Sequence, residues 1–66
     1  MKKLIPKATL ARYSKLIIEA NNLNNCYKET GVHYATIKKI IKTGFASQAH
    51  IAKLNAYCDE VESVND

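Results

Sequence analysis

Residues 30–44 read TGVHYATIKKIIKTG, and this stretch decides the fold. Gly31 and Gly44 enclose a segment of the length of a short helix. At about 100° per residue, its isoleucines fall on one side of a helix and its lysines on the other. The residues before Gly31 also have a helical pattern, and Gly31-Val32-His33 is typical of a tight connection between two helices that meet at a steep angle. A helix that is apolar behind and lysine-rich in front suits the major groove of DNA.

The rest of the chain extends this pattern into a small all-α domain. Apolar residues recur at helical spacing on both sides of the central stretch, and no segment alternates as a strand does. The asparagines among residues 21–25 favour caps and turns, and Ser47 is a good N-cap for a last helix. The sequence therefore predicts no strand and a domain of four helices, or five, which we place at residues 8–20, 23–30, 34–43 and 48–61.

Length and composition favour one domain. The chain has 66 residues, and a chain this short buries only about 60% of its unfolded surface. Apolar residues make up 47%, so disorder is not expected. The opening residues imitate a signal peptide, but Pro6 and Lys7 end the apolar run, and no segment is long enough to span a membrane. We expect a soluble cytoplasmic protein without membrane contact.

The charges are unevenly distributed along the chain. Residues 1–58 hold all ten basic side chains against two acidic ones, a formal net charge of +8, whereas residues 59–66 are acidic. A small domain this basic is expected to bind a polyanion, although lysines can also serve only to solvate a surface. The acidic residues from Asp59 onward oppose the dipole of the last helix, so we expect a frayed C-terminal tail.

The sequence gives no sign of a metal site or of catalysis. Cys26 and Cys58 are expected to be small buried residues, and a zinc site with His33 and His50 is disfavoured because no C-x-x-C or H-x3-H spacing is present. No nucleophile and base are paired by a motif, and no phosphate-binding glycine loop exists. We therefore expect no enzyme activity, no metal, no cofactor and no small-molecule substrate.

Residues 23–44 resemble the helix-turn-helix of the lambda Cro and repressor group of regulators, also called the Xre type. Gly31 matches the glycine that begins the turn, and Val32 matches the apolar residue after it. Ile37 and Ile40 match two buried aliphatic residues of the recognition helix, and Gly44 matches the glycine that commonly follows that helix. The resemblance implies a lambda repressor-like fold and a role in transcription, as in regulators of phages and other mobile elements. It also implies a bacterial cell or a phage-infected host.

Some residues depart from the family pattern. Tyr27 stands where the family favours alanine, at the contact between the second and third helices. Leu23 stands where a glutamine usually supports a phosphate contact. These two positions concern the packing and backbone contact of the second helix, and they leave the recognition helix in place.

The resemblance also implies which residues contact DNA. Base contacts would come from the first part of the third helix, at Tyr34, Ala35, Lys38 and Lys39. The helical wheel independently places the last three of these on the outward face. Phosphate contacts are expected from His33, Thr36, Lys42, Thr43 and Ser47. The lysines at positions 2, 3 and 7 form either a basic arm or a solvated terminus.

Two classes of function fit these observations. The first is a sequence-specific regulator that binds double-stranded DNA, with a homodimer on a pseudo-palindromic operator. The second is a protein-interaction module, such as a small inhibitor or adaptor on a helix-turn-helix scaffold. For the dimer contact we expect the fourth helix, with Tyr57 and Val61 partly exposed, or otherwise the first helix.

Overall fold

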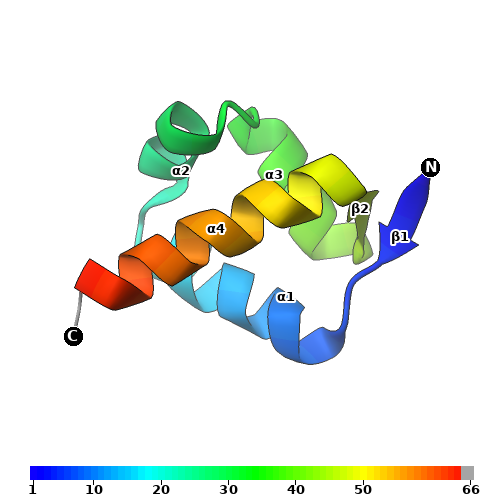
Figure 1. Ribbon diagram of the computed structural model, residues 1–66, viewed down its shortest axis with the longest axis horizontal. Helices are drawn as coiled ribbons and strands as arrows, with labels where there is room; N and C mark the ends of the chain where they lie inside the picture. The colour runs from blue at the N-terminus through cyan, green and yellow to red at the C-terminus, as the bar shows by residue number, and fades with distance from the viewer. Residues whose placement is uncertain (65–66) are drawn as a thin grey trace.

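The computed structural model describes residues 1–64, and in them apolar side chains from every helix meet in one core. The helix α4, Gln48–Val64, crosses the middle of the molecule. In Figure 1, α1, Lys7–Tyr13, lies on one side of α4 and α2, Leu23–Thr30, on the other, and α3, Tyr34–Thr43, passes behind α4. This described part is mostly helical, as predicted. The buried core residues are Ile5, Tyr13, Ile17, Cys26, Val32, Ile37, Ile40, Ala46, Leu54, Tyr57 and Cys58.

The helices α2 and α3 occupy the ranges predicted from the sequence. Both end at a glycine in the left-handed conformation, Gly31 with φ +76° and Gly44 with φ +80°. Each glycine N–H donates to the carbonyl four residues back, at 2.8 Å, which closes the last turn. A side chain at either position would strain this backbone, so glycine fixes where both helices stop.

The predicted first helix is present but changes its winding. After α1 the chain continues as a π-helical segment η1, Ser14–Glu19. Hydrogen bonds five residues apart mark it, from Ala20 N to Lys15 O at 3.2 Å and from Asn22 N to Ile17 O at 2.9 Å. The helical run therefore covers residues 7–19 rather than 8–20, and Asn21, with φ +57°, turns the chain toward α2.

The prediction that the chain has no strand was wrong. Strand β1, Lys2–Leu4, pairs antiparallel with β2, Phe45–Ser47, in the register Lys2 to Ser47. Ile5 N–H extends the ribbon by donating to Gly44 O at 2.8 Å. Strands of three residues are too short to show an alternating pattern, and their partners lie far apart in the sequence. The ribbon places the N-terminal lysines beside the end of α3.

The last helix extends beyond its predicted end at residue 61, and the fraying expected from Asp59 onward stays a prediction. The helix α4 continues to Val64, and the last two residues of the expected tail, at positions 65 and 66, lie outside the described part. Arg12 of α1 donates hydrogen bonds to both Asp59 and Glu62, and these bonds raise the pKa of its guanidinium. One cation thus holds two carboxylates on successive turns and offsets their unfavourable place at the helix C-terminus.

Replacing Arg12 should release the end of α4. We expect Arg12→Ala to lower the free energy of unfolding by about 0.5–1 kcal/mol, because this ion-pair cluster is exposed to water. The loss should be local. Amide hydrogen exchange should speed up after Asp59 in the variant while α3 keeps its protection, and Lys15→Ala serves as a control for removing a cation. Unchanged exchange after Asp59 would mean that the pairs do not hold the helix.

The predicted partial exposure of Tyr57 is wrong. Its side chain is 4% exposed, and its hydroxyl accepts a hydrogen bond from Asn25 Nδ2 at 2.9 Å. The sequence does not reveal this partner, because α2 and α4 meet only in the fold. A charged substitution at Tyr57 would therefore disrupt the core rather than report on a dimer contact. Val61 is partly buried.

Stability should fall at alkaline pH through Cys58. Burial raises the pKa of its thiol from 9.0 to about 11. A folded-state pKa above the unfolded one contributes stability that is complete below about pH 9 and is lost as the pH rises toward 11. The free energy of unfolding, measured with urea, should fall by about 2 kcal/mol between about pH 8 and pH 11 because of this thiol.

The matched control for this pH dependence is Cys58→Ala. Its stability should fall less steeply over the same range, although its value at pH 8 is lower. Burial raises the pKa of the Tyr13 phenol to about 12, with the Cys58 thiolate as a smaller cause, so Tyr13 titrates in both proteins mainly above the range used here. Parallel pH profiles for the two proteins would contradict the assignment to Cys58.

Candidate nucleic-acid interface

The lysine-bearing side of α3 is open to solvent. Ala35, Lys38, Lys39 and Lys42 are all exposed, whereas Ile37 on the opposite side is fully buried. The amphipathic pattern predicted from the sequence is therefore confirmed. Because the outward residues are three or four positions apart, the three lysines form one cationic stripe along the helix.

Three aromatic rings stand at the beginning of this stripe. His33 is the N-cap of α3, and its Nδ1 accepts a hydrogen bond from Ala35 N–H at 3.1 Å. The His33 and Tyr34 ring centroids lie 4.2 Å apart, and Tyr27 of α2 reaches His33 at 5.2 Å. All three residues are exposed. The connection between α2 and α3 thus carries an aromatic surface cluster, which we define as Tyr27, His33 and Tyr34.

A groove of about 230 Å³ runs along the other flank of α3. It lies between this helix, the β-ribbon and the first turn of α4. The surfaces that line it combine two ammonium groups, three hydroxyls and an imidazole with some apolar area. The lining residues are Lys2, Thr36, Lys39, Ile40, Thr43, Phe45, Ala46, Ser47 and His50. A groove with this set of hydrogen-bond donors is chemically suited to a phosphate group.

The hydroxyls of this groove differ in what they can still donate. Ser47 Oγ accepts from His50 N–H at 3.3 Å as the N-terminal cap of α4, so its own proton remains free for a ligand. Thr43 Oγ1 already donates to Lys39 O at 2.8 Å. Ser47 is therefore the better placed donor of the two.

The structure gathers the sequence-predicted residues into three adjoining groups. His33 and Tyr34 belong to the aromatic surface cluster, and Ala35, Lys38 and Lys42 form the open face. The groove collects the others, which are Thr36, Lys39, Thr43 and Ser47. Lys39 stands where the open face meets the groove.

Phe45, His50 and Tyr27 were not predicted for the candidate interface, and Lys2 was predicted only as part of a basic arm or a solvated terminus. Lys2, Phe45 and His50 line the groove, and Tyr27 joins the aromatic cluster. His50 is partly exposed at the groove. No sequence signal could place Lys2, because its position depends on the pairing of β1 with β2. Tyr27 was noted only as a departure from alanine.

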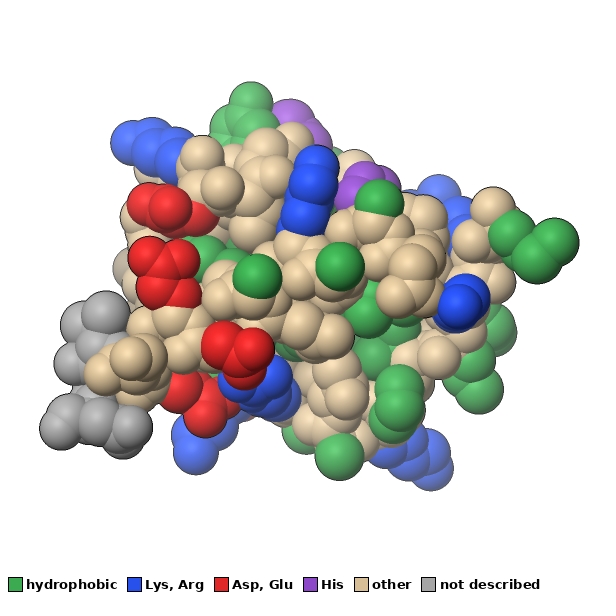
Figure 2. All heavy atoms as spheres, in the orientation of Figure 1, with side chains coloured by type: hydrophobic (Ala, Val, Ile, Leu, Met, Phe, Trp, Pro, Cys, Tyr) green, Lys and Arg blue, Asp and Glu red, His purple; other side chains and the backbone are tan. Residues whose placement is uncertain are grey.

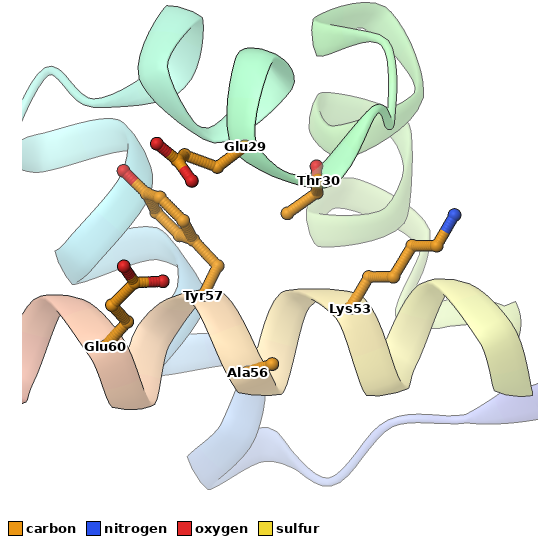
Figure 3. A pocket seen from close by; sticks show the side chains of 6 residues that line it. All are labelled: Glu29, Thr30, Lys53, Ala56, Tyr57 and Glu60. Carbon is orange, nitrogen blue, oxygen red and sulfur yellow. The ribbon is translucent and has the colours of Figure 1, made fainter.

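A second hollow of about 230 Å³ lies between α2 and α4 (Figure 3). Glu29 and Glu60 lie on either side of the Tyr57 ring, and Lys53 lies further along α4. Burial raises the pKa of the Tyr57 phenol. Two carboxylates make this hollow a poor place for a phosphate, so it differs in kind from the groove beside α3.

The acidic side chains collect away from the interface. Figure 2 shows them at the end of the molecule where α4 finishes, and Arg12 is paired there with Asp59 and Glu62. In this view the acidic side chains lie toward one end of the molecule, with basic side chains beside some of them. Approach of a polyanion to α3 is not opposed by these carboxylates.

Cys26 and Cys58 are buried free thiols whose pKa is raised by burial, and among residues 1–64 no three metal-binding side chains come together. None of the helices in this part of the chain is long and apolar enough to cross a membrane. No protein-family model, curated protein or solved structure matches the chain.

Proposed function

We propose that this protein is a sequence-specific regulator that binds double-stranded DNA through a helix-turn-helix of the Cro and repressor type. One observation supports this most: the exposed cationic stripe on α3, with buried isoleucines behind it and with glycines that end α2 and α3. Such a helix can enter the major groove while the body of the domain stays outside.

In this proposal the three adjoining groups have different roles. The N-terminal half of α3 reads base edges through Tyr34, Ala35, Lys38 and Lys39, because lysine donates to guanine O6 and N7. Lys42 binds the backbone one turn further along. The groove receives a phosphate from the same backbone strand, with the Ser47 hydroxyl and the Lys2 ammonium as its donors.

A homodimer completes the proposal. One recognition helix reads only a few base pairs, and a two-fold axis doubles the readout on a pseudo-palindromic operator. In such dimers the recognition helices enter successive major grooves about 34–36 Å apart. We place the contact away from Tyr57, since that side chain is buried.

The second candidate function is a protein-interaction module. The hollow between α2 and α4 is the observation that favours it, because Glu29 and Glu60 beside the Tyr57 ring suit a basic side chain of a partner protein. Fold alone does not separate the two candidates, so the test must measure DNA binding directly.

Selection from a random pool of duplexes tests the proposal. We expect enrichment of one sequence with two-fold symmetry, bound by two copies of the chain. Enrichment of a sequence without symmetry would support DNA binding and would contradict the proposed dimer. A pool that stays random after repeated rounds would contradict the proposed function and favour the protein-interaction module.

The groove gives a separate expected result for Lys2. Lys2→Ala should weaken binding to all duplexes alike and lower the slope of log K against log salt by about one, because one phosphate contact is lost. Lys53→Ala is the matched control, since that lysine lines the hollow between α2 and α4. Equal salt slopes for Lys2→Ala and the unaltered protein would show that Lys2 does not contact a phosphate.

A further inference from the structure

The aromatic surface cluster needs an explanation that core packing does not supply. Tyr27 is 37% exposed and Tyr34 is 45% exposed, although large aromatic side chains are usually buried more fully. Their rings contact each other edge to face with centroids 6.0 Å apart, and both contact His33. The three rings therefore brace one another at the surface and not in the core.

This bracing restricts the orientation of Tyr34. The His33 ring is fixed by its hydrogen bond to Ala35 N–H, and it lies 4.2 Å from the Tyr34 ring at an angle of 30°. Tyr27 from α2 covers another side of the pair. An aromatic ring held in this way loses little conformational entropy when a ligand covers it.

The cluster also stands at the end of α3 where bases would be read. Tyr34 is the first residue of the helix, Ala35 follows it, and Lys38 lies one turn further on the same side. An apolar surface made of ring carbons and the Ala35 methyl thus adjoins the cationic stripe. In the major groove, the only large apolar feature of the bases is the C5-methyl group of thymine.

We propose that Tyr34, braced by Tyr27 and His33, recognises the methyl group of a thymine in the operator. This inference rests on the proposed function, because it names the base that the beginning of α3 reads. Tyr34 is the contacting residue, and Ala35 adds a second apolar surface. Tyr27 and His33 are positioning residues that hold the ring of Tyr34.

Replacing thymine by deoxyuridine in the selected duplex tests the inference. Deoxyuridine keeps the base pair and lacks only the methyl group. At one thymine in each half-site we expect binding by the unaltered protein to weaken about threefold to fivefold per half-site, the value of one buried methyl. Tyr34→Ala should bind more weakly overall and should no longer distinguish the two duplexes.

Three further variants make this comparison specific. Tyr34→Phe keeps the ring without its hydroxyl, so it should retain the preference for thymine. Lys42→Ala should weaken binding to both duplexes equally and leave the ratio of the two affinities unchanged. Tyr27→Ala should reduce the ratio while keeping the fold, because Tyr27 is exposed and acts only on the orientation of Tyr34.

The outcomes separate this inference from the proposed function. A selected operator whose affinity is unaffected by deoxyuridine at every thymine would overturn the inference and leave the DNA-binding function standing. The same holds if Tyr34→Ala keeps the full preference. A third outcome is that the thymine and deoxyuridine duplexes bind with equal affinity, while Tyr34→Ala lowers binding to a single-stranded thymidine oligonucleotide. That result would overturn the inference, because the cluster would then stack on unpaired bases. Absence of any enriched duplex would contradict both the proposed function and this inference.

Discussion

Ile37→Ala is expected to lower the free energy of unfolding by about 2–5 kcal/mol, the usual cost of truncating a buried isoleucine to alanine. Ile37 is fully buried at the inner side of α3. A domain of this size has a total stability of only about 3–10 kcal/mol, at roughly 0.05–0.15 kcal/mol per residue. The variant should therefore be close to unfolding at room temperature. Urea unfolding followed by circular dichroism measures the change.

Ile18→Ala is the matched control for this substitution. Ile18 lies in η1 and is 39% exposed, so its truncation leaves no closed cavity and should cost less than about 1 kcal/mol. A similar loss in both variants would mean that α3 does not anchor the core. The comparison also matters for function. Burial of the isoleucine side of α3 in the core keeps its lysine side at the surface.

Lys39→Ala should cost about 1–3 kcal/mol in operator affinity and relax the preference at one base position. The expected loss is about fivefold to 150-fold, since about 1.4 kcal/mol corresponds to a factor of ten. Lys39 is exposed on the outward side of α3, next to the groove. Competition binding against duplexes altered at single positions measures both effects.

Lys42→Ala provides the contrast with Lys39→Ala. Lys42 lies nearly one turn further along α3, where we expect the backbone rather than the bases. Its loss should weaken all duplexes alike and lower the salt slope by about one. If both substitutions have the same effect on every sequence, the stripe binds DNA through charge alone.

The local elements of this fold could be predicted, because their signals are local. Gly31 and Gly44 adopt left-handed conformations that few other residues tolerate, and they fix the ends of α2 and α3 at the predicted residues. The isoleucine and lysine spacing likewise identifies the two sides of α3. For the same reason, the predicted site residues Ala35, Lys38 and Lys42 are found on one exposed face.

The features that escaped prediction all depend on contacts between distant residues. The β-ribbon joins residues 2–4 to residues 45–47, and it brings Lys2 to the groove. Arg12 extends α4 by pairing with two carboxylates that would otherwise destabilise its end. Asn25 of α2 donates a hydrogen bond to the Tyr57 hydroxyl of α4. Helical periodicity reports which side of a helix is apolar, and it does not report which polar groups will meet there.

The central claim is sequence-specific binding to double-stranded DNA, and one titration tests it most directly. Fluorescence anisotropy should be measured with the selected duplex and with a scrambled duplex of the same length and composition, each at about 50 and 200 mM salt. We predict that the selected duplex binds at least about a thousandfold more tightly than the scrambled one, and that both affinities fall steeply with salt. Equal affinity for the two duplexes, or no binding to either at the lower salt concentration, would contradict the claim.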